Sequence, residues 1–577
     1  MRKRLFWILA AVLLMTGCGK SSQPDHYDFE EDQTMNEGQG EKESSVQDEE
    51  AEEILEDREP ETQEFPENGQ LPYGVVTRCE WISRDDEVLS GFTIPLPDDF
   101  YSFLVSYSCD GLYIKADGYE KLNAELIQNN NHSWRTMYDN RYCVAEDLEE
   151  ALKNNPEYAS AYFPWTYENT VKVNRADERV FSFVRSSYTY LGGAHPGTDL
   201  KGYSYDTQSG KELLISDVVT DQEKFRVRVK EKLLENKELK EGGYENWQEI
   251  ADDILKISET TNFCFTGTGL QVIFPTYVLG PYVMGDVIVE LPYEENSDLV
   301  KEEYLLTGRE TCLKLEPYES ASVDLDGDGE EEELLVSYEE EWDEEYGYCT
   351  GILTTVSVTK NGEEKTAVER GGLAYCSSYL MENEEGEYYL YVETTSENDW
   401  HNIAVFDVGS SGGPVMKGYT DTGAFYEMLP FDAQNFYLGH RLDMMGMWYG
   451  FRRCAVGRDG FPEMKQEDYS LWPVSEPELF GEEDKGDAIS GRLVLRQDFE
   501  ADCHETPEDR DRSRKQVLSE GSVLIPCRTD GETWMMFRTE EGSYVDVYYD
   551  EMDPDTWERT IGGVNECDLF EGIFYAG

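Results

Sequence analysis

The segment from residue 19 to residue 70 most limits what this chain can fold into. It carries nineteen Asp and Glu residues against three Lys and Arg residues, with almost no aromatic residues. Such a segment cannot bury enough apolar surface to offset the entropy of ordering, and its like charges repel one another. We therefore expect residues 19–70 to form a disordered acidic tether, which leaves the folded domains to the residues that follow.

The residues before the tether have the pattern of a lipoprotein signal peptide. Three cations at positions 2–4 precede an apolar run over 5–15, which ends at Met15-Thr16-Gly17-Cys18. The run is too short for a permanent membrane-spanning helix, and small residues before a cysteine are typical of a lipoprotein cleavage site. We expect residues 1–18 to be a signal peptide with a lipobox. Acyl chains such as palmitate on Cys18 would then anchor the protein to the extracellular side of the cell membrane.

The whole chain is strongly acidic, with 122 Asp and Glu residues, 49 Lys and Arg residues and a formal net charge of −73. Removing the three signal-peptide cations takes this charge to −76 (−73 − 3). No basic surface is available to replace the counterions of nucleic-acid phosphates, so the composition excludes nucleic-acid binding. It favours a cationic partner or bound divalent cations instead.

Cysteine spacing limits the chemistry further. Of the twelve cysteines, eleven remain once Cys18 is acylated, and they form no C-x-x-C pair. This spacing argues against a structural zinc site or thioredoxin-like chemistry. It leaves open whether the others form disulfides or remain as buried thiols.

After the tether, the chain is long enough for two or three domains. We expect a first domain over residues 71–300, a second over 316–489 and a third over 490–577.

The first region alternates helical and strand patterns. Apolar residues recur at helical spacing over 117–129, 146–153 and 246–256, and Thr220 to Glu223 has the pattern of a capping box before a further helix. The expected strands are Val180–Tyr190, Lys201–Tyr205, Leu213–Ile215, Phe263–Thr266, Leu270–Phe274 and Val287–Leu291. This mixture predicts an α+β fold in which helices pack on antiparallel sheet.

The region after residue 316 reads as mostly β. Short strands with a turn at Asn361-Gly362 indicate a sandwich or a partial propeller over 316–489. Four further strands between 492 and 549 indicate a small β-barrel-like domain over 490–577.

Three motifs of the first region resemble a known family. They are Gly192-Gly193-Ala194-His195, the hairpin from Gly202 to Asp217, and the stretch from Tyr277 through Gly280-Pro281-Tyr282 to Gly285. Together they resemble the extracellular domain of RsiV-like anti-sigma factors, of the DUF4163 and DUF3298 type. A peptidoglycan deacetylase carries the same region. The resemblance covers residues from about 110 to 293, and it implies the α+β fold already expected.

The resemblance also implies a function outside the cell. In the anti-sigma relatives this domain binds lysozyme, but the sequence shows no sigma-binding or membrane-spanning segment. In the deacetylase relatives a catalytic module follows, with an Asp and two His as metal ligands. Here the nearest match is His132-Ser133 followed by Thr136 where the second His would stand. We therefore expect neither an anti-sigma factor nor an enzyme.

Three residues of these motifs, His195, Tyr277 and Tyr282, are candidates for a functional role. His195 has no nucleophile or second acid nearby in sequence, so we interpret it as structural. For Tyr277 and Tyr282 we expect core packing.

An acidic loop in the second region has the spacing of a calcium site. Asp324, Asp326, Asp328 and Glu332 occupy loop positions one, three, five and nine, and a glycine stands at position six. Hard Ca²⁺ prefers oxygen ligands at this spacing. Position twelve is Leu335 rather than Glu, so the loop resembles the calcium hairpins of FG-GAP-like repeats more than an EF-hand. A plain acidic turn is the alternative.

These features predict a membrane-anchored extracellular lipoprotein whose first domain is a non-catalytic binding module at the cell envelope, with lysozyme or peptidoglycan as its ligand. The alternative is an accessory or degenerate cell-wall glycan enzyme, and a third possibility is a structural envelope module. The ligand-binding residues stay unknown at this point.

Overall fold

The computed structural model describes residues 70–83, 88–92, 103–116, 118–138, 165–191, 195–305, 312–343, 349–396, 400–426, 428, 430–473, 478–481, 491–550, 559–573 and 575. The predicted signal peptide, the tether and the helix expected at 146–153 lie outside these residues. The described residues form an α+β region followed by a mostly β region, so the predicted fold class is confirmed.

A six-stranded sheet forms the first part of the α+β region, in the order β2-β1-β3-β4-β5-β6. Its neighbouring strands pair antiparallel except β3 and β4, which are parallel. The predicted strand Val180–Tyr190 is β5 without change. The strands are β1 (Tyr73–Ser83), β2 (Val88–Phe92), β3 (Phe103–Ile114), β4 (Trp165–Ala176), β5 (Val180–Tyr190) and β6 (Gly197–Asp206).

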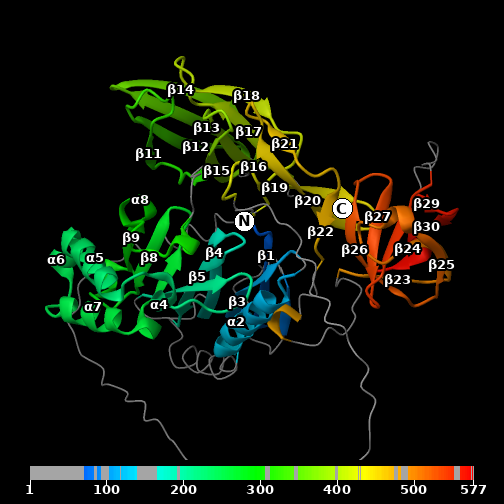
Figure 1. Ribbon diagram of the computed structural model, residues 1–577, viewed down its shortest axis with the longest axis horizontal. Coiled ribbons are helices and arrows are strands. Elements are labelled where there is room, and N and C mark those ends of the chain that lie inside the picture. Colours follow the sequence, from blue (N-terminus) through cyan, green and yellow to red (C-terminus); the bar gives the residue numbers. More distant parts are fainter. Residues whose placement is uncertain are drawn as a thin grey trace, which may run out of the picture. The chain divides into compact units, whose positions relative to one another are not determined.

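Helix α2 (Glu120–Tyr138) packs beside β3 (Figure 1). Its buried Leu122 and Leu126 face the sheet, as their spacing predicts. The fully buried amide of Asn130 joins the two elements, because it accepts from Leu112 N and donates to Leu112 O at 3.0 and 2.9 Å. The helix runs well past the predicted end at residue 129. Among the described residues, no helix is both long and apolar enough to span a membrane.

A three-stranded sheet and several helices make up the second part of the α+β region (Figure 1). Phe225, Val229 and Leu233 of one helix are buried against the strands, as predicted. The strands are β7 (Phe263–Phe265), β8 (Gly269–Phe274) and β9 (Val287–Pro292), and the helices are α4 (Ile215–Val218), α5 (Gln222–Glu235), α6 (Lys237–Gly242), α7 (Trp247–Lys256) and α8 (Tyr293–Asn296).

Two local predictions here are wrong. The expected strand at 213–215 does not form, because Ile215 begins helix α4, where the Asp217 carboxylate accepts the backbone N–H of Leu214 at 3.1 Å. The residue that caps α5 is Asp221 rather than Thr220, since its carboxylate accepts from Lys224 N at 3.0 Å.

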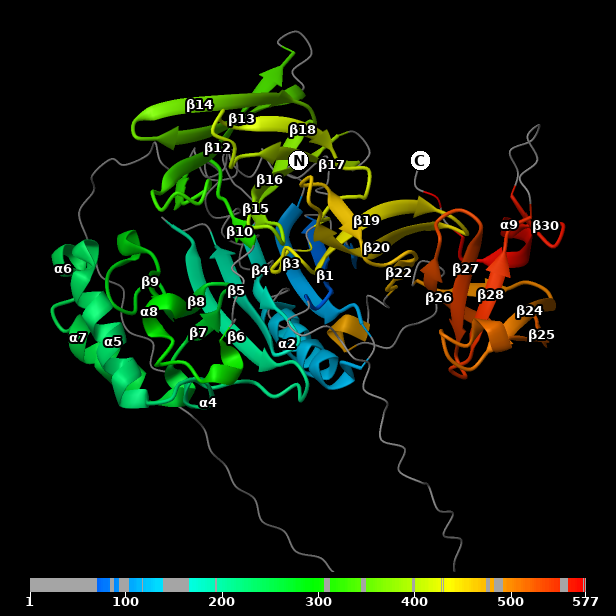
Figure 2. The same cartoon turned by 45° about the horizontal axis from the view of Figure 1, so that its top comes forward.

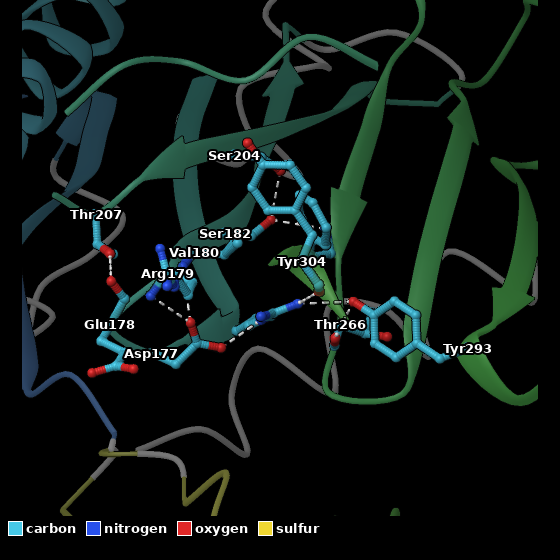
Figure 3. A network of polar contacts seen from close by, with 12 residues as sticks. Asp177, Glu178, Arg179, Val180, Ser182, Ser204, Thr207, Thr266, Tyr293 and Tyr304 are labelled. Atoms are coloured by element: carbon cyan, nitrogen blue, oxygen red, sulfur yellow. Dashed lines mark hydrogen bonds and ion pairs between the residues drawn. The ribbon is translucent and has the colours of Figure 1, made fainter. Parts of the chain in front are cut away.

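A buried guanidinium connects the two sheets of the α+β region (Figure 3). Arg175 of β4 forms an ion pair with Asp177 at 2.6 Å, and its side chain is 1% exposed. The same guanidinium donates to the Tyr293 hydroxyl at 3.0 Å and to the Tyr304 carbonyl at 2.7 Å. It also lies against the ring of Phe265 in β7. The contacts of Arg175 with Phe265, Tyr293 and Tyr304 therefore join β4 to the second part of the α+β region, and its ion pair with Asp177 holds the turn between β4 and β5.

The region after residue 312 begins with a sandwich of two sheets, which lie one over the other (Figure 2). Apolar side chains of both sheets form its core. One sheet comprises β10 (Cys312–Lys314), β15 (Ala374–Glu382), β16 (Tyr388–Thr395), β17 (His401–Asp407) and β18 (Val415–Tyr419). The other comprises β11 (Ser320–Val323), β12 (Glu332–Trp342), β13 (Cys349–Lys360) and β14 (Glu363–Arg370). The sequence predicted either a sandwich or a partial propeller for this region, and the structure shows a sandwich.

The last sheet contains eleven strands. Its strand β22 pairs with β26 through Ser470 and Arg528, so hydrogen-bonded strands cross the expected boundary between 489 and 490. The strands are β19 (Phe436–Asp443), β20 (Met447–Val456), β21 (Pro462–Met464), β22 (Tyr469–Leu471), β23 (Leu493–Leu495), β24 (Phe499–His504), β25 (Arg514–Leu518), β26 (Val523–Thr529), β27 (Trp534–Thr539), β28 (Tyr544–Tyr548) and β31 (Phe570–Glu571).

Replacing Arg175 tests the buried connection. We expect Arg175→Met to destabilise the α+β region by about 3–5 kcal/mol, because the change leaves a buried carboxylate and carbonyl without their partner. Native-state hydrogen exchange of the β4 and β7 amides measures this free energy. The control is Arg179→Met, whose side chain is exposed. If the β4 and β7 amides exchange equally slowly in Arg175→Met and Arg179→Met, Arg175 does not stabilise the α+β region as proposed.

Candidate functional site

The two most characteristic motifs of the first region meet in an exposed aromatic cluster, which consists of His195, Tyr277 and Tyr282. The imidazole of His195 stacks on the ring of Tyr282, with centroids 4.0 Å apart and planes at 15°. The hydroxyl oxygen of Tyr277 lies 3.2 Å from His195 Nε2. Residues about eighty positions apart in the chain therefore form one surface.

The loop between β8 and β9 positions the two tyrosines. Tyr277 adopts a left-handed backbone conformation with φ of 71°, which is costly for a non-glycine residue. The Asp286 carboxylate holds this loop, because it accepts from both the backbone N–H and the hydroxyl of Thr276, at 2.8 and 2.9 Å. Tyr282 begins the 3-10 helix η4 (Tyr282–Met284). A Cβ at Gly280 would lie 2.6 Å from Met284 Sδ, so the flexible end of the Met284 side chain would have to move to accept a larger residue there.

The cluster continues into an exposed apolar residue. Val283 follows Tyr282 in η4 and is 89% exposed, and Tyr277 is 48% exposed. An aromatic ring offers an apolar face with a polar edge, and large exposed apolar side chains mark interaction surfaces. The cluster therefore has the chemistry of a binding surface for a partner with apolar faces and hydroxyl groups.

The core packing predicted for Tyr277 and Tyr282 is wrong, because one is exposed and the other is only half-buried. From the sequence alone, aromatic residues are normally assigned to the core. Here Tyr277 has a left-handed backbone conformation, and its side chain is exposed to solvent. Gly192, Gly193 and Ala194 of the first motif lie outside the described residues, as does the lipidation residue Cys18. His132 and Thr136 lie on α2, where the Thr136 hydroxyl donates to the His132 carbonyl.

The acidic loop converges on a lysine. Asp326 and Asp328 each place a carboxylate oxygen within 2.8 Å of Lys360 Nζ, at 2.8 and 2.6 Å. Glu332, whose side chain is 3% exposed, lies 2.6 Å from the same nitrogen. Hydrogen bonds from Lys360 hold the pKa of Asp328 below its usual range. Three of the four predicted calcium ligands therefore surround an ammonium group.

The fourth predicted ligand stabilises the loop backbone instead. The Asp324 carboxylate accepts the N–H groups of Asp328 and Gly329 at 3.1 and 2.9 Å. Glu332 also accepts from Leu325 N at 2.8 Å through its second oxygen. Sequence reasoning missed Lys360, because only the pairing of β12 with β13 brings it opposite the loop. The turn signal at Asn361-Gly362, directly after Lys360, was the one hint available.

Comparisons with known proteins identify two segments of the α+β region. Residues 106–198 match the family model described as deacetylase PdaC. Residues 215–294 match the model described as a protein of unknown function, DUF3298. The chain contains a PdaC domain and a DUF3298 domain. Arg175 and His195 lie in the first, and Tyr277, Tyr282 and Tyr293 lie in the second.

Solved DUF3298 proteins resemble part of the chain. A DUF3298 family member from Bacteroides fragilis is 16% identical, with a TM-score of 0.30, and the match covers 41% of this chain and 95% of the other. A DUF3298 family protein from Pseudomonas aeruginosa is 15% identical, with a TM-score of 0.25, and the match covers 40% and 95%. No curated protein matches the sequence.

Proposed function

We propose that this protein is a lipid-anchored extracellular binding module of the cell envelope, and that its aromatic cluster binds peptidoglycan without catalysing a reaction. The exposed stack of His195 on Tyr282 carries this proposal. Beside this stack, Tyr277 is exposed and has a backbone φ of 71°, which is costly for a tyrosine. Strained backbone is common at functional sites, and exposed large apolar side chains mark interaction surfaces, so both features support a binding role.

Two observations support a glycan as the ligand. Sugar rings have apolar C–H faces and hydroxyl edges, which match the stacked rings and the Tyr277 hydroxyl beside His195 Nε2. The cluster also lies where the PdaC and DUF3298 domains contribute to one surface, and the first of these families is described as a deacetylase. The chemistry of the surface therefore favours a glycan, and we propose that this glycan is peptidoglycan.

Lysozyme is the second candidate ligand, and the charge of the chain favours it. A formal net charge of −73 attracts a basic protein over long distances and raises its association rate. Electrostatic capture of this kind weakens steeply with salt, whereas stacking of sugars on aromatic rings does not. The dependence on ionic strength therefore separates the two ligands.

We further propose that the acidic loop binds Ca²⁺ in exchange for Lys360. Carboxylate oxygens of three residues already point at one nitrogen, and backbone N–H groups orient Asp324 and Glu332. Hard cations prefer such oxygen ligands. The ammonium group marks the position that a divalent cation would take when the flexible lysine side chain swings into solvent.

Cys18 supplies the anchor in this proposal. The cations at 2–4, the apolar run over 5–15 and the small residues before Cys18 support cleavage and acylation at that position. One acyl chain gives only marginal membrane binding, so stable anchoring requires more than one on the processed cysteine.

Substitution in the aromatic cluster tests peptidoglycan binding. We expect Tyr282→Ala in the full chain to weaken binding to purified peptidoglycan by about tenfold or more, because truncating an aromatic hot-spot residue typically costs about 2 kcal/mol or more. Sedimentation of the protein with insoluble wall material measures the affinity. The matched control is Tyr548→Ala, since Tyr548 is 47% exposed on β28.

The same proteins, assayed also for lysozyme binding and for release of glycan from the wall material, distinguish the proposed functions. Equal binding by both tyrosine variants contradicts the aromatic cluster as the site. Salt-sensitive binding to lysozyme, with none to peptidoglycan, favours the second ligand. Release of modified or cleaved glycan by the wild-type protein supports the alternative of an accessory cell-wall enzyme.

Calorimetry tests the calcium proposal. We expect Lys360→Met to bind Ca²⁺ at least about tenfold more tightly than the wild type, because the change removes a competing cation. Asp326→Ala should bind more weakly than the wild type. Lys365→Met is the control, since Lys365 Nζ contacts the Ser411 carbonyl rather than the loop. No heat with Ca²⁺ in either the wild type or Lys360→Met would end the proposal.

Cell fractionation tests the anchor. The wild-type protein should incorporate labelled palmitate and sediment with membranes, whereas Cys18→Ser should do neither, because it has no acylated thiol. Cys567→Ser is the control, since Cys567 carries an exposed thiol. Palmitate label that persists in Cys18→Ser would show that the lipid is attached elsewhere.

A further inference from the structure

Three neighbouring strands of the sandwich bring together a cysteine, a glutamate and a histidine. Cys376 lies on β15, Glu393 on β16 and His401 on β17. One potential ligand atom from each residue lies within 4.8 Å of those from the other two. None of these residues belongs to the acidic loop or to the aromatic cluster.

The register of the strands explains why the three side chains meet. Glu393 pairs with Ser377, and His401 pairs with Thr395, two positions from Glu393. Side chains two residues apart on a strand share a face, so Glu393 and His401 point to the same side of the sheet. Cys376 sits at a β-bulge, where the register shifts between Tyr375 and Ser377. A bulge re-aims a side chain, and here it adds the thiol to the glutamate and histidine.

The glutamate and the histidine are held in place within a largely buried setting. Their side chains are 3% and 10% exposed, and Glu393 Oε1 lies 3.1 Å from His401 Nδ1. The other oxygen of Glu393 accepts from the Ser377 hydroxyl at 2.9 Å. The backbone N–H of Tyr426 donates to Glu393 Oε1 at 3.1 Å.

Tyr426 supplies a second sign of a built site. Its backbone has a φ of 47°, an unfavourable value for a tyrosine, and its ring lies against His401 with centroids 4.4 Å apart. Strained backbone of this kind persists only where surrounding contacts enforce it, and it is common beside functional groups. The ring covers one side of the imidazole and limits its movement.

We propose that Cys376, Glu393 and His401 form a binding site for a borderline transition-metal ion, with Zn²⁺ as the expected occupant. A thiolate, an imidazole and a carboxylate are the ligand types that bind Zn²⁺, whereas Ca²⁺ and Mg²⁺ select oxygen ligands alone. Three protein ligands leave a fourth position of a tetrahedral ion for water or an external group.

The surrounding hydrogen bonds have the arrangement that such a site requires. Ser377 and the backbone of Tyr426 hold the carboxylate, as outer-shell groups hold the ligands of metal sites. Uptake of the ion needs the thiolate and the neutral imidazole, so binding releases protons to solvent. The ion then takes the place of the hydrogen-bonding proton between Glu393 and His401.

This site is independent of peptidoglycan binding, and the proposal departs from one expectation from the sequence. The lack of a C-x-x-C pair argued against zinc, but that argument concerns sites built from one loop. Here positions 376, 393 and 401 come from three strands, and only the pairing of those strands joins them.

Cobalt substitution tests the proposal on the purified, reduced and chelator-treated full chain. Co²⁺ should bind with one-to-one stoichiometry and show a thiolate-to-metal charge-transfer band in the near ultraviolet, together with visible bands of tetrahedral cobalt. We expect Cys376→Ser to lose the charge-transfer band. Cys349→Ser should keep it, because Cys349 is a half-buried thiol in the facing sheet whose Sγ contacts the Gly351 carbonyl.

Competition with a chromogenic chelator measures the affinity for Zn²⁺. Loss of His401 in His401→Ala should weaken binding by at least about 100-fold, above the 10- to 100-fold range typical of losing an outer-shell partner. His440→Ala is the control, since His440 is partly buried on β19 and its Nε2 lies 3.3 Å from the Asp421 carbonyl.

The wild-type protein decides the matter even where a variant fails to fold. A rise in its melting temperature with Zn²⁺, reversed by chelator, supports a site in the folded state. Failure of the wild type to take up Co²⁺ or Zn²⁺ overturns the proposal. A charge-transfer band that survives Cys376→Ser, in protein with unchanged circular dichroism, overturns it as well.

Discussion

The buried guanidinium of Arg175 is the interaction on which the α+β region depends. It lies in the PdaC domain, and two of its partners, Tyr293 and the carbonyl of Tyr304, lie in or just after the DUF3298 domain. An arginine that is 1% exposed is costly without an ion-pair partner and hydrogen-bond acceptors, so we expect this contact to limit relative movement of the two domains.

The aromatic cluster also joins the two domains. His195 comes from one domain, and Tyr277 and Tyr282 come from the other, so their stacking requires the two domains to keep one relative position. Neither domain presents the complete surface alone.

Some regular elements were readable from the sequence, whereas the contacts of the aromatic cluster and of Lys360 were not. Strand Val180–Tyr190 was predicted without error, because alternation and turn residues are local signals. The tyrosines of the cluster were assigned to the core, since a left-handed backbone at Tyr277 has no signature in residue type. The role of Lys360 required the register of β12 with β13, which spacing along the chain does not contain.

The bulge at Cys376 shows that the number of residues in β15, and not only their identity, determines which side chains meet at the proposed metal site. Tyr375 pairs with Thr394 and Ser377 pairs with Glu393, so the strand holds one residue more than its partner at this point. Tyr375 therefore packs into the sandwich core while Ser377 faces the opposite side. Regular pairing of β15 with β16 does not require this extra residue. The bulge that it forms bends the strand locally, and it brings the sulfur near the imidazole and the carboxylate.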